Sequence, residues 1–377
     1  NGKDDPRGVK SPKDDRATEV RKETVVVLDA TQAEARDAII AIGREALTKI
    51  QDESGLFNIV PKEKKDELAK YPSAAAINSL CVEALIESGE PVGGGTRVLR
   101  GVEAVAKLWR DMNAKNRLRD PSVQDAAAIL SLYERYAREL DPSRKQRNRL
   151  ALLPNSARSQ VADLAKYVLS LQKADGMWGE LRSSNYGSLD DEDSVASWAG
   201  RVVEHDLMNT YSAVRGLEAA QELGVAVDPA VFQKLATTLT AIQSSRGPEV
   251  VLPRMTWSNE AKTFVTSTDG STVRANARGW TFTGDTVNSE TGKILPREGA
   301  MTASAIYSLV VARQRLAAAP KLLEPLAQHI DVSIKDGIAW MEKNFITHGN
   351  PASYDDAKTV SPMPHLHYFY LWSAGEA

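Results

Sequence analysis

The sequence contains few of the features on which several protein classes depend. Cys81 is the only cysteine among 377 residues, so no internal disulfide can form. It lies in an apolar helical run, where we expect a buried structural thiol. No apolar run reaches the roughly 18 residues that a membrane-spanning helix needs. A net charge of −3 supplies no field that would collect nucleic acid. The sequence therefore predicts no disulfide framework, no membrane span and no nucleic-acid partner.

The motifs of nucleotide and cofactor sites are also missing. The glycine-rich stretch "EPVGGGTRVLR" (90–100) lacks the Lys-Ser/Thr pair of a phosphate-binding loop, and it is typical of a flexible connector. No dinucleotide fingerprint and no nucleophilic triad is visible. We therefore predict no cofactor.

The chain begins with a polar stretch and continues as one domain. Residues 1–23 carry mixed charge and almost no large apolar groups, which predicts a disordered or extended tail. The run "TVVVLD" (24–29) is compatible with a short strand, and 24–377 reads as one repeat domain. The first residue is Asn1 rather than Met, and we expect export to the periplasm or cell envelope, with the cytoplasm as the alternative.

Four helical runs repeat one pattern of small residues. Each has Ala, then Ile or Val, a free position, Ser or Gly, and Leu. The Ala and the Ser or Gly lie three positions apart on one helix face, which allows a neighbouring helix to approach closely. These runs are expected to be inner helices, and they are "SAAAINSL" (73–80), "DAAAILSL" (125–132), "TYSAVRGL" (210–217) and "TASAIYSL" (302–309).

A second helical run precedes each inner helix and ends in a recurring signature. In "YVLSLQKADGMW" (167–178), Gln172, Gly176 and Trp178 follow an apolar helix. We expect the Gln to bond carbonyls at the end of its own helix, the Gly to make a left-handed turn, and the aromatic ring to pack over the junction. The same structural spacing recurs elsewhere at Gln51, Gly55 and Phe57, and Gln243 ends a third such run.

The stretch 167–178 resembles the QW motif of squalene–hopene cyclases. With the four inner helices, the chain resembles the prenyltransferase/squalene-oxidase-repeat proteins of planctomycete-type bacteria. The resemblance implies an all-α fold, an α/α-toroid of about five to six helix-pair repeats, with a small β-hairpin-like insertion in the fourth unit.

In class II cyclases a D-x-D-D motif at the start of an inner helix protonates an alkene. The matching positions here run from Asp206 to Thr210, and Met208 stands where the proton donor would be. A second acidic run holds Glu192 and Asp193 in the order D-x-E-D-S, and it is open to three interpretations: a solvated loop, a Ca²⁺ site or a catalytic acid. Asp206, Glu192 and Asp193 are the catalytic candidates.

Prenyltransferases of the same fold bind Zn²⁺ through Asp, Cys and His. Here the lone cysteine has no nearby histidine, and only His365 and His367 form a spaced pair near the C-terminus. They are weak metal-ligand candidates, and we predict no metal site.

Two insertions lengthen the third and fourth units, at about 179–206 and 247–299. In the second, alternating residues surround the "DGST" turn (269–272), which predicts a hairpin. Insertions of repeat proteins often form the binding rim, so we take Trp and charged side chains there as binding candidates. For Trp280 there is also a structural interpretation, in which it is the aromatic residue of the Gln243 unit, separated from that Gln by the insertion. The candidates are Arg254, Trp257, Trp280, Asp285 and Arg297.

Three functions remain open from the sequence. The first is a non-catalytic binding or scaffold protein of the bacterial envelope, with a homo-oligomeric or other protein partner. The second is a class II terpene cyclase acting on an isoprenoid. The third is a carbohydrate-active toroid that binds a glycan, for which Tyr211 and Arg215 supply suitable side chains if they converge with His367 on one groove.

Overall fold

The computed structural model describes residues 30–57, 74–112, 121–142, 149–179, 205–284, 295–353, 361–363 and 366–376. These residues are mostly helical, with small antiparallel sheets, so the prediction of a helical protein is confirmed in this coarser form. The helices are α1 (Ala30–Ile50), α2 (Ala74–Glu87), α3 (Arg97–Met112), α4 (Val123–Leu140), η2 (Arg149–Leu152), α5 (Asn155–Arg158), α6 (Val161–Ser170), α8 (Leu207–Glu222), α9 (Pro229–Ile242), α10 (Gly299–Leu316), α11 (Pro320–Leu323), α12 (Ala327–Asn344) and α13 (His367–Glu376).

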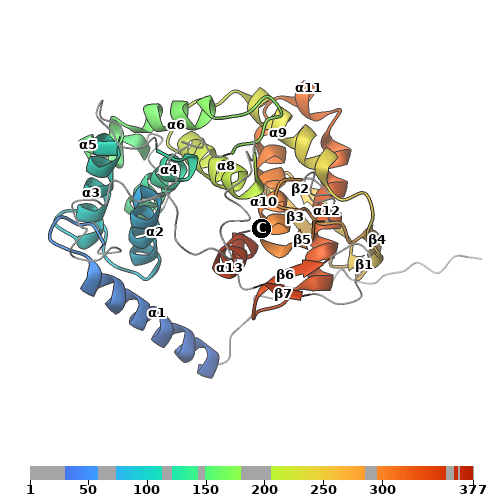
Figure 1. Ribbon diagram of the computed structural model, residues 1–377, viewed down its shortest axis with the longest axis horizontal. Helices are drawn as coiled ribbons and strands as arrows, with labels where there is room; N and C mark the ends of the chain where they lie inside the picture. The colour runs from blue at the N-terminus through green and yellow to red at the C-terminus, as the bar shows by residue number, and fades with distance from the viewer. Residues whose placement is uncertain are drawn as a thin grey trace, which may run out of the picture.

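The four predicted inner runs lie in consecutive neighbouring helices. Helix α4 packs against α2 and α8, and α10 packs against α8 and α13. Figure 1 shows α2, α4, α8 and α10 curving around α13, with α3, α6, α9 and α12 on the outer side. We refer to these two sets as the inner and outer helices. The predicted close approach is observed between α4 and α8, since a Cβ at Gly216 would lie 2.6 Å from the Cα of Ala127.

Gln172 joins two successive outer helices. Its Nε2 donates to the carbonyl of Gly176 at 2.9 Å and to that of Val231, near the start of α9, at 3.1 Å. The prediction that this Gln bonds carbonyls at the end of its own helix is therefore wrong: its partners lie in the following turn and in the next outer helix. The turn at Gly176, with φ +90°, carries the chain back past the side chain, and the next outer helix starts beside it. Gln51 repeats this arrangement by donating to the carbonyls of Gly55 and Arg97. Gln243 does so with the carbonyls of Arg278 and Ser333.

The aromatic residue of this signature is fully buried in each copy. The indole of Trp178 donates to the carbonyl of Val168 at 2.8 Å, and its backbone N–H donates to Thr210 Oγ1 on α8 at 3.1 Å. Phe57 has the equivalent backbone bond to Asn78 Oδ1 on α2 at 2.9 Å. Each aromatic thus connects the end of an outer helix to the first turns of an inner helix.

Seven short strands form three small sheets among the described residues. The second insertion is a bent hairpin, in which β1 pairs with β4 and β2 with β3. The third sheet, of β5, β6 and β7, was not predicted, and it brings the start of α10 next to the segment after α12. The strands are β1 (Glu249–Pro253), β2 (Met255–Ser258), β3 (Thr263–Thr266), β4 (Thr272–Asn276), β5 (Arg297–Glu298), β6 (Asn350–Ser353) and β7 (Ser361–Met363).

The hairpin prediction is correct for the insertion but wrong for its turn. The tip lies between β2 and β3, where Lys262 has φ 57°, and not at the "DGST" segment. Asp269 accepts hydrogen bonds from Ser267 Oγ and from the N–H of Ser271, and this turn interrupts the strand between β3 and β4. The same bonds lower the pKa of Asp269 to about 2.

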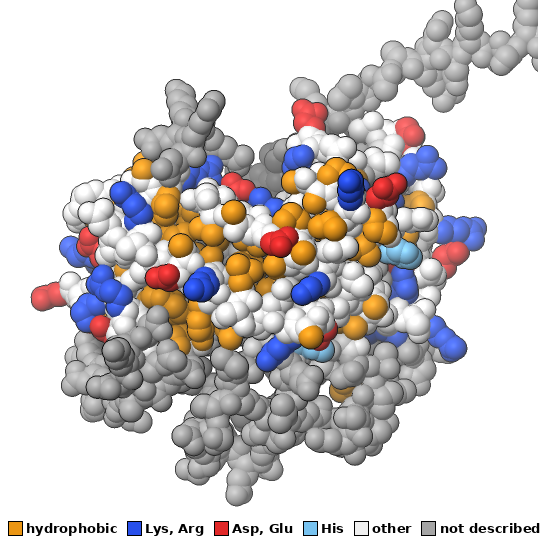
Figure 2. Space-filling model, turned by 90° about the horizontal axis from the view of Figure 1, so that it is seen from above, with side chains coloured by type: hydrophobic (Ala, Val, Ile, Leu, Met, Phe, Trp, Pro, Cys, Tyr) orange, Lys and Arg blue, Asp and Glu red, His pale blue; other side chains and the backbone are white. Residues whose placement is uncertain are grey.

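Surface features of the described residues add two observations. No helix among them combines the length and apolar character that a membrane crossing requires. On the face shown in Figure 2, side chains of both charges are scattered among apolar ones, without a continuous field of one sign.

Candidate functional site

A polar cavity of about 380 Å³ opens between the C-terminal halves of α4 and α8. Side chains of α4, η2, α8 and α10 form its wall, and most of them are charged. We call it the polar cavity, and its lining residues are Ser131, Glu134, Arg135, Arg138, Arg149, Arg215, Glu218, Ala219, Glu222 and Tyr307.

Alternating charges connect the wall of the polar cavity across three inner helices. Arg149 Nη1 on η2 lies 3.1 Å from Glu134 of α4 and 3.8 Å from Glu222 of α8. Arg315 of α10 lies 3.2 Å from Glu222 and 3.2 Å from Glu218. Each of these carboxylates therefore contacts a guanidinium, which offsets part of the cost of desolvating the charges.

The polar cavity adjoins a second, smaller one of about 130 Å³. The two share Ser131 and Arg215, but the wall of the smaller cavity is largely apolar, with Met208, Phe369 and Trp372 among its residues. We call it the apolar pocket. Its volume is well below the roughly 300–1,000 Å³ of ligand pockets for drug-sized molecules.

Aromatic side chains fill the space beside the apolar pocket. The ring of Tyr211 makes edge contacts with Tyr307, Phe369 and Trp372, at centroid distances of 5.1, 5.5 and 5.3 Å. Arg215 stacks on Trp372 at 4.9 Å. Tyr211 is 0% exposed, so its hydroxyl is not presented to solvent.

Arg215 is engaged on its other side as well. Its Nη2 lies 2.8 Å from Glu83 of α2. The sequence placed Tyr211 and Arg215 together as ligand-binding residues, and the structure brings both onto Trp372. His367 is five residues earlier on α13, with its ring tilted against Tyr368 at a centroid distance of 5.5 Å.

Asp206 is the N-cap of α8 and is 4% exposed. Its two carboxylate oxygens accept hydrogen bonds from the backbone N–H and from the side-chain amide of Asn209, at 2.7 and 2.6 Å. Both carboxylate oxygens of Asp206 therefore act as hydrogen-bond acceptors, as expected of a helix N-cap. Met208 faces the apolar pocket, where a cyclase would need its acid. Glu192 and Asp193 lie outside the described residues.

Burial raises the pKa of the Glu134 carboxyl, and the neighbouring Arg138, Arg149 and Arg135 only partly offset this effect. Glu134 is 9% exposed and stands in the wall of the polar cavity. The sequence analysis did not select Glu134, although a glutamate followed by two arginines on an inner helix could have indicated it.

We expect Glu134→Gln to change how stability depends on pH. The folded-state pKa is raised, so wild-type Glu134 stabilises the fold fully below its unfolded pKa of about 4.5. That contribution is lost as pH rises through the folded-state pKa. The difference between the melting temperature of the variant and that of the wild type should therefore become more positive as the pH rises from acid to neutral. Differential scanning fluorimetry over this range, with the exposed Glu324→Gln as control, tests the trend; the opposite trend would contradict it.

The binding candidates of the second insertion take part in packing. Trp257 contacts Phe264 at a centroid distance of 5.5 Å and Arg313 of α10 at 5.0 Å, which holds the hairpin on the helices. Trp280 is 1% exposed, which favours its structural alternative as the aromatic of the Gln243 unit. Arg254 is exposed, and Asp285 lies outside the described residues.

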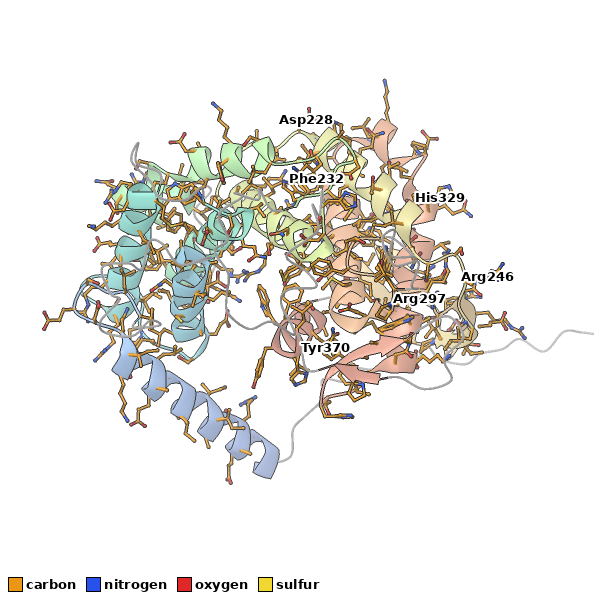
Figure 3. All side chains as sticks on the ribbon, viewed as in Figure 1. Asp228, Phe232, Arg246, Arg297, His329 and Tyr370 are labelled. Carbon is orange, nitrogen blue, oxygen red and sulfur yellow. The ribbon has the colours of Figure 1, made fainter. Side chains whose placement is uncertain are left out.

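Arg297 lies on β5, in the interior together with Tyr370 of α13 (Figure 3). Burial lowers the pKa of its guanidinium. Arg297 is 7% exposed and so contributes little to the outer surface, and its binding role stays a prediction. Arg297 belongs to the β5–β6–β7 sheet, which the sequence did not reveal, and pairs there with Ser353 of β6.

No cluster of three potential metal ligands occurs among the described residues. His365 lies outside them. His205, adjacent to the cap of α8, has Nδ1 2.5 Å from Asp175 Oδ2 and Nε2 3.1 Å from the carbonyl of Thr283. These contacts join the turn after α6 to the end of the second insertion.

A groove of about 710 Å³ separates α1 from α2 and α13, and its wall is mainly apolar. We call it the α1 groove. Figure 1 shows α1 lying apart from the other helices along this side. Its lining residues are Ile40, Gly43, Arg44 and Leu47 of α1, Leu80, Glu83, Ala84, Glu87 and Ser88 of α2 and its C-terminal end, and Tyr368, Phe369 and Trp372 of α13.

No protein-family model, no curated protein and no solved structure matches the chain. The family resemblance therefore depends on the sequence motifs, and function has to be argued from the site itself.

Proposed function

We propose that the chain is a non-catalytic scaffold protein built on an α/α-toroid, and that it assembles with further copies of itself through the α1 groove. The toroid is supported by the succession of inner-helix contacts and by the outer helices packed behind them. The recurring Gln and aromatic contacts are what a helix-pair repeat would require.

One observation carries the assembly. Eight of the twelve large apolar side chains left exposed in the described part of the chain lie on α1, α2 and α13. Soluble monomers rarely leave such a patch uncovered. The eight are Ile39, Ile40, Ile42, Ile50, Ile77, Leu80, Tyr368 and Leu371.

Helix α1 carries both halves of a self-complementary interface. Ile40 and Leu47 line the groove, whereas Ile39 and Ile42 point elsewhere and are 70% and 68% exposed. In a two-fold pair, the second face of one α1 would enter the groove of the other copy, so each copy supplies a ridge and receives one.

Against the cyclase alternative, Met208 stands at the donor position of the motif among the described residues, and the apolar pocket is small for an isoprenoid. Catalysis is therefore not part of the proposal. Location in the bacterial envelope remains part of it, on the family resemblance alone.

Light scattering after size-exclusion chromatography, together with native mass spectrometry, tests the assembly. We expect a defined oligomer at micromolar concentration, and Ile42→Glu should weaken it at least about tenfold, equivalent to about 1.4 kcal/mol. Val251→Glu is the control, because Val251 is 58% exposed on β1, away from the groove. A monomeric wild type would contradict the proposal, and a co-purifying isoprenoid would instead favour the cyclase-like alternative.

A further inference from the structure

The hydroxyl of Ser131 has no hydrogen-bond partner in the described part of the chain. The residue is 5% exposed, and it lines both the polar cavity and the apolar pocket. Buried hydroxyls are almost always bonded, so an unbonded one on a residue that lines a cavity points to a missing partner there.

The matching positions of the repeat make this hydroxyl unusual. Ser79 of α2 donates to the carbonyl of Ala75 at 2.7 Å, and Ser308 of α10 donates to that of Ser304 at 2.8 Å. Both therefore bond back to their own helix, four residues earlier. Ser131 occupies the same place in the pattern but makes no such bond. Its hydroxyl is therefore left buried and unbonded on a residue that lines both cavities.

The wall around Ser131 supplies donors and acceptors in balance. The arginines that line or adjoin the polar cavity are each in contact with a glutamate, including Arg135 with Glu87. Arg138 is the most weakly engaged of them, with its Nη1 3.7 Å from Glu134 and its side chain 34% exposed. Its N–H groups are placed to donate to a ligand.

The balance of charge selects the class of ligand. An added anion or cation would leave one unpaired charge in a partly buried network, which is unfavourable. A hydroxyl group both donates and accepts, so a hydroxyl-rich neutral molecule can bond to guanidinium and carboxylate groups together. The volume of about 380 Å³ is at the lower end of the range for ligand pockets.

We propose that the polar cavity binds a small neutral sugar, of mono- or disaccharide size, with Ser131 and Arg138 as direct hydrogen-bond donors. This site is separate from the α1 groove and does not depend on the assembly proposed above.

The test uses the whole chain and a panel of sugars as probes. Common neutral mono- and disaccharides, among them maltose, cellobiose and lactose, are compared with the anion glucuronate and the cation choline by saturation-transfer NMR and calorimetry. We expect neutral sugars to bind and the two charged probes not to bind. Ser131→Ala should weaken binding about two- to tenfold, the loss of one neutral hydrogen bond. Its melting temperature should not fall, because the hydroxyl that is removed is unbonded.

Matched variants separate a direct contact from a general effect. Arg138→Met should weaken binding about tenfold or more, because it removes a charged donor. Ser79→Ala should leave affinity unchanged, since its hydroxyl is bonded within α2. The proposal is overturned if no neutral sugar binds, if glucuronate alone binds, or if Ser131→Ala binds as tightly as the wild type. Equal losses in Ser79→Ala and Ser131→Ala would also overturn it.

Discussion

Replacing Trp280 by alanine is expected to lower the free energy of unfolding by about 3–5 kcal/mol. The side chain is 1% exposed, so its removal leaves a large cavity. The indole N–H also donates to the carbonyl of Leu239 at 2.9 Å, and this bond would be lost. The backbone N–H of Trp280 bonds to Thr302 Oγ1 at 3.2 Å, as that of Trp178 does to Thr210.

These contacts make Trp280 the aromatic residue of the Gln243 unit. Leu239 lies four residues before Gln243, just as Val168 lies four residues before Gln172. The hairpin of β1–β4 is therefore inserted between the Gln and the aromatic residue of this unit, and the usual contacts of the aromatic residue are made after the hairpin.

Trp257→Ala is the matched control for Trp280→Ala. Trp257 belongs to the same insertion, but it is half-buried. Its ring packs on Phe264 and Arg313, and its indole N–H donates to Asn259 Oδ1 at 3.2 Å in an exposed hydrogen bond. Its loss should lower the free energy of unfolding by about 1 kcal/mol. Urea denaturation followed by circular dichroism measures both variants. Equal effects of the two substitutions would contradict the structural role assigned to Trp280.

Gly176→Ala is expected to destabilise the fold by about 2–5 kcal/mol. The left-handed conformation, with φ +90°, accounts for about 1–2 kcal/mol of this once a Cβ is present. A Cβ would also lie 2.6 Å from the carbonyl carbon of Lys234 and 2.7 Å from the nitrogen of Leu235, and relief of such overpacking costs about 1–3 kcal/mol. Both atoms belong to the backbone of α9, which cannot move without disturbing its helix.

Gly224→Ala isolates the conformational part of that effect. Gly224 has φ +96°, but nothing lies within 4 Å of a Cβ built there. It should lose only about 1–2 kcal/mol in the same urea experiment. If the two glycine variants are equally stable, the close approach between the turn at Gly176 and α9 is not a constraint on the fold.

The periodic features of this protein were predictable from sequence. The small residues of the four inner runs mark one face each, and helices are observed at all four. The pattern identified Gly216 as a site of close approach, whereas its partner there is Ala127 and not the patterned Ala128. The Gln, Gly and aromatic spacing likewise identified a recurring junction, although not the next outer helix as the second partner of the Gln.

The candidate sites were much less predictable. Glu134, Arg149 and Glu222 are distant in sequence and carry no shared spacing, so only the packing of α4, η2 and α8 brings them to one cavity. The sequence identified Ser131 as one of four equivalent small residues. It could not show that the hydroxyl of Ser131 is unbonded, because Ser79 and Ser308 occupy the same position in the pattern and their hydroxyls are bonded.

The sequence by itself determined the mostly helical character, the positions of the inner helices and the hairpin in the second insertion. These are local properties, set by which side chains recur on one face of a helix or strand. Only the tertiary structure decided which Trp and Arg residues are buried, where α13 packs, and where cavities remain. Burial and charge pairing depend on neighbours that are remote in the chain, and no local pattern encodes them.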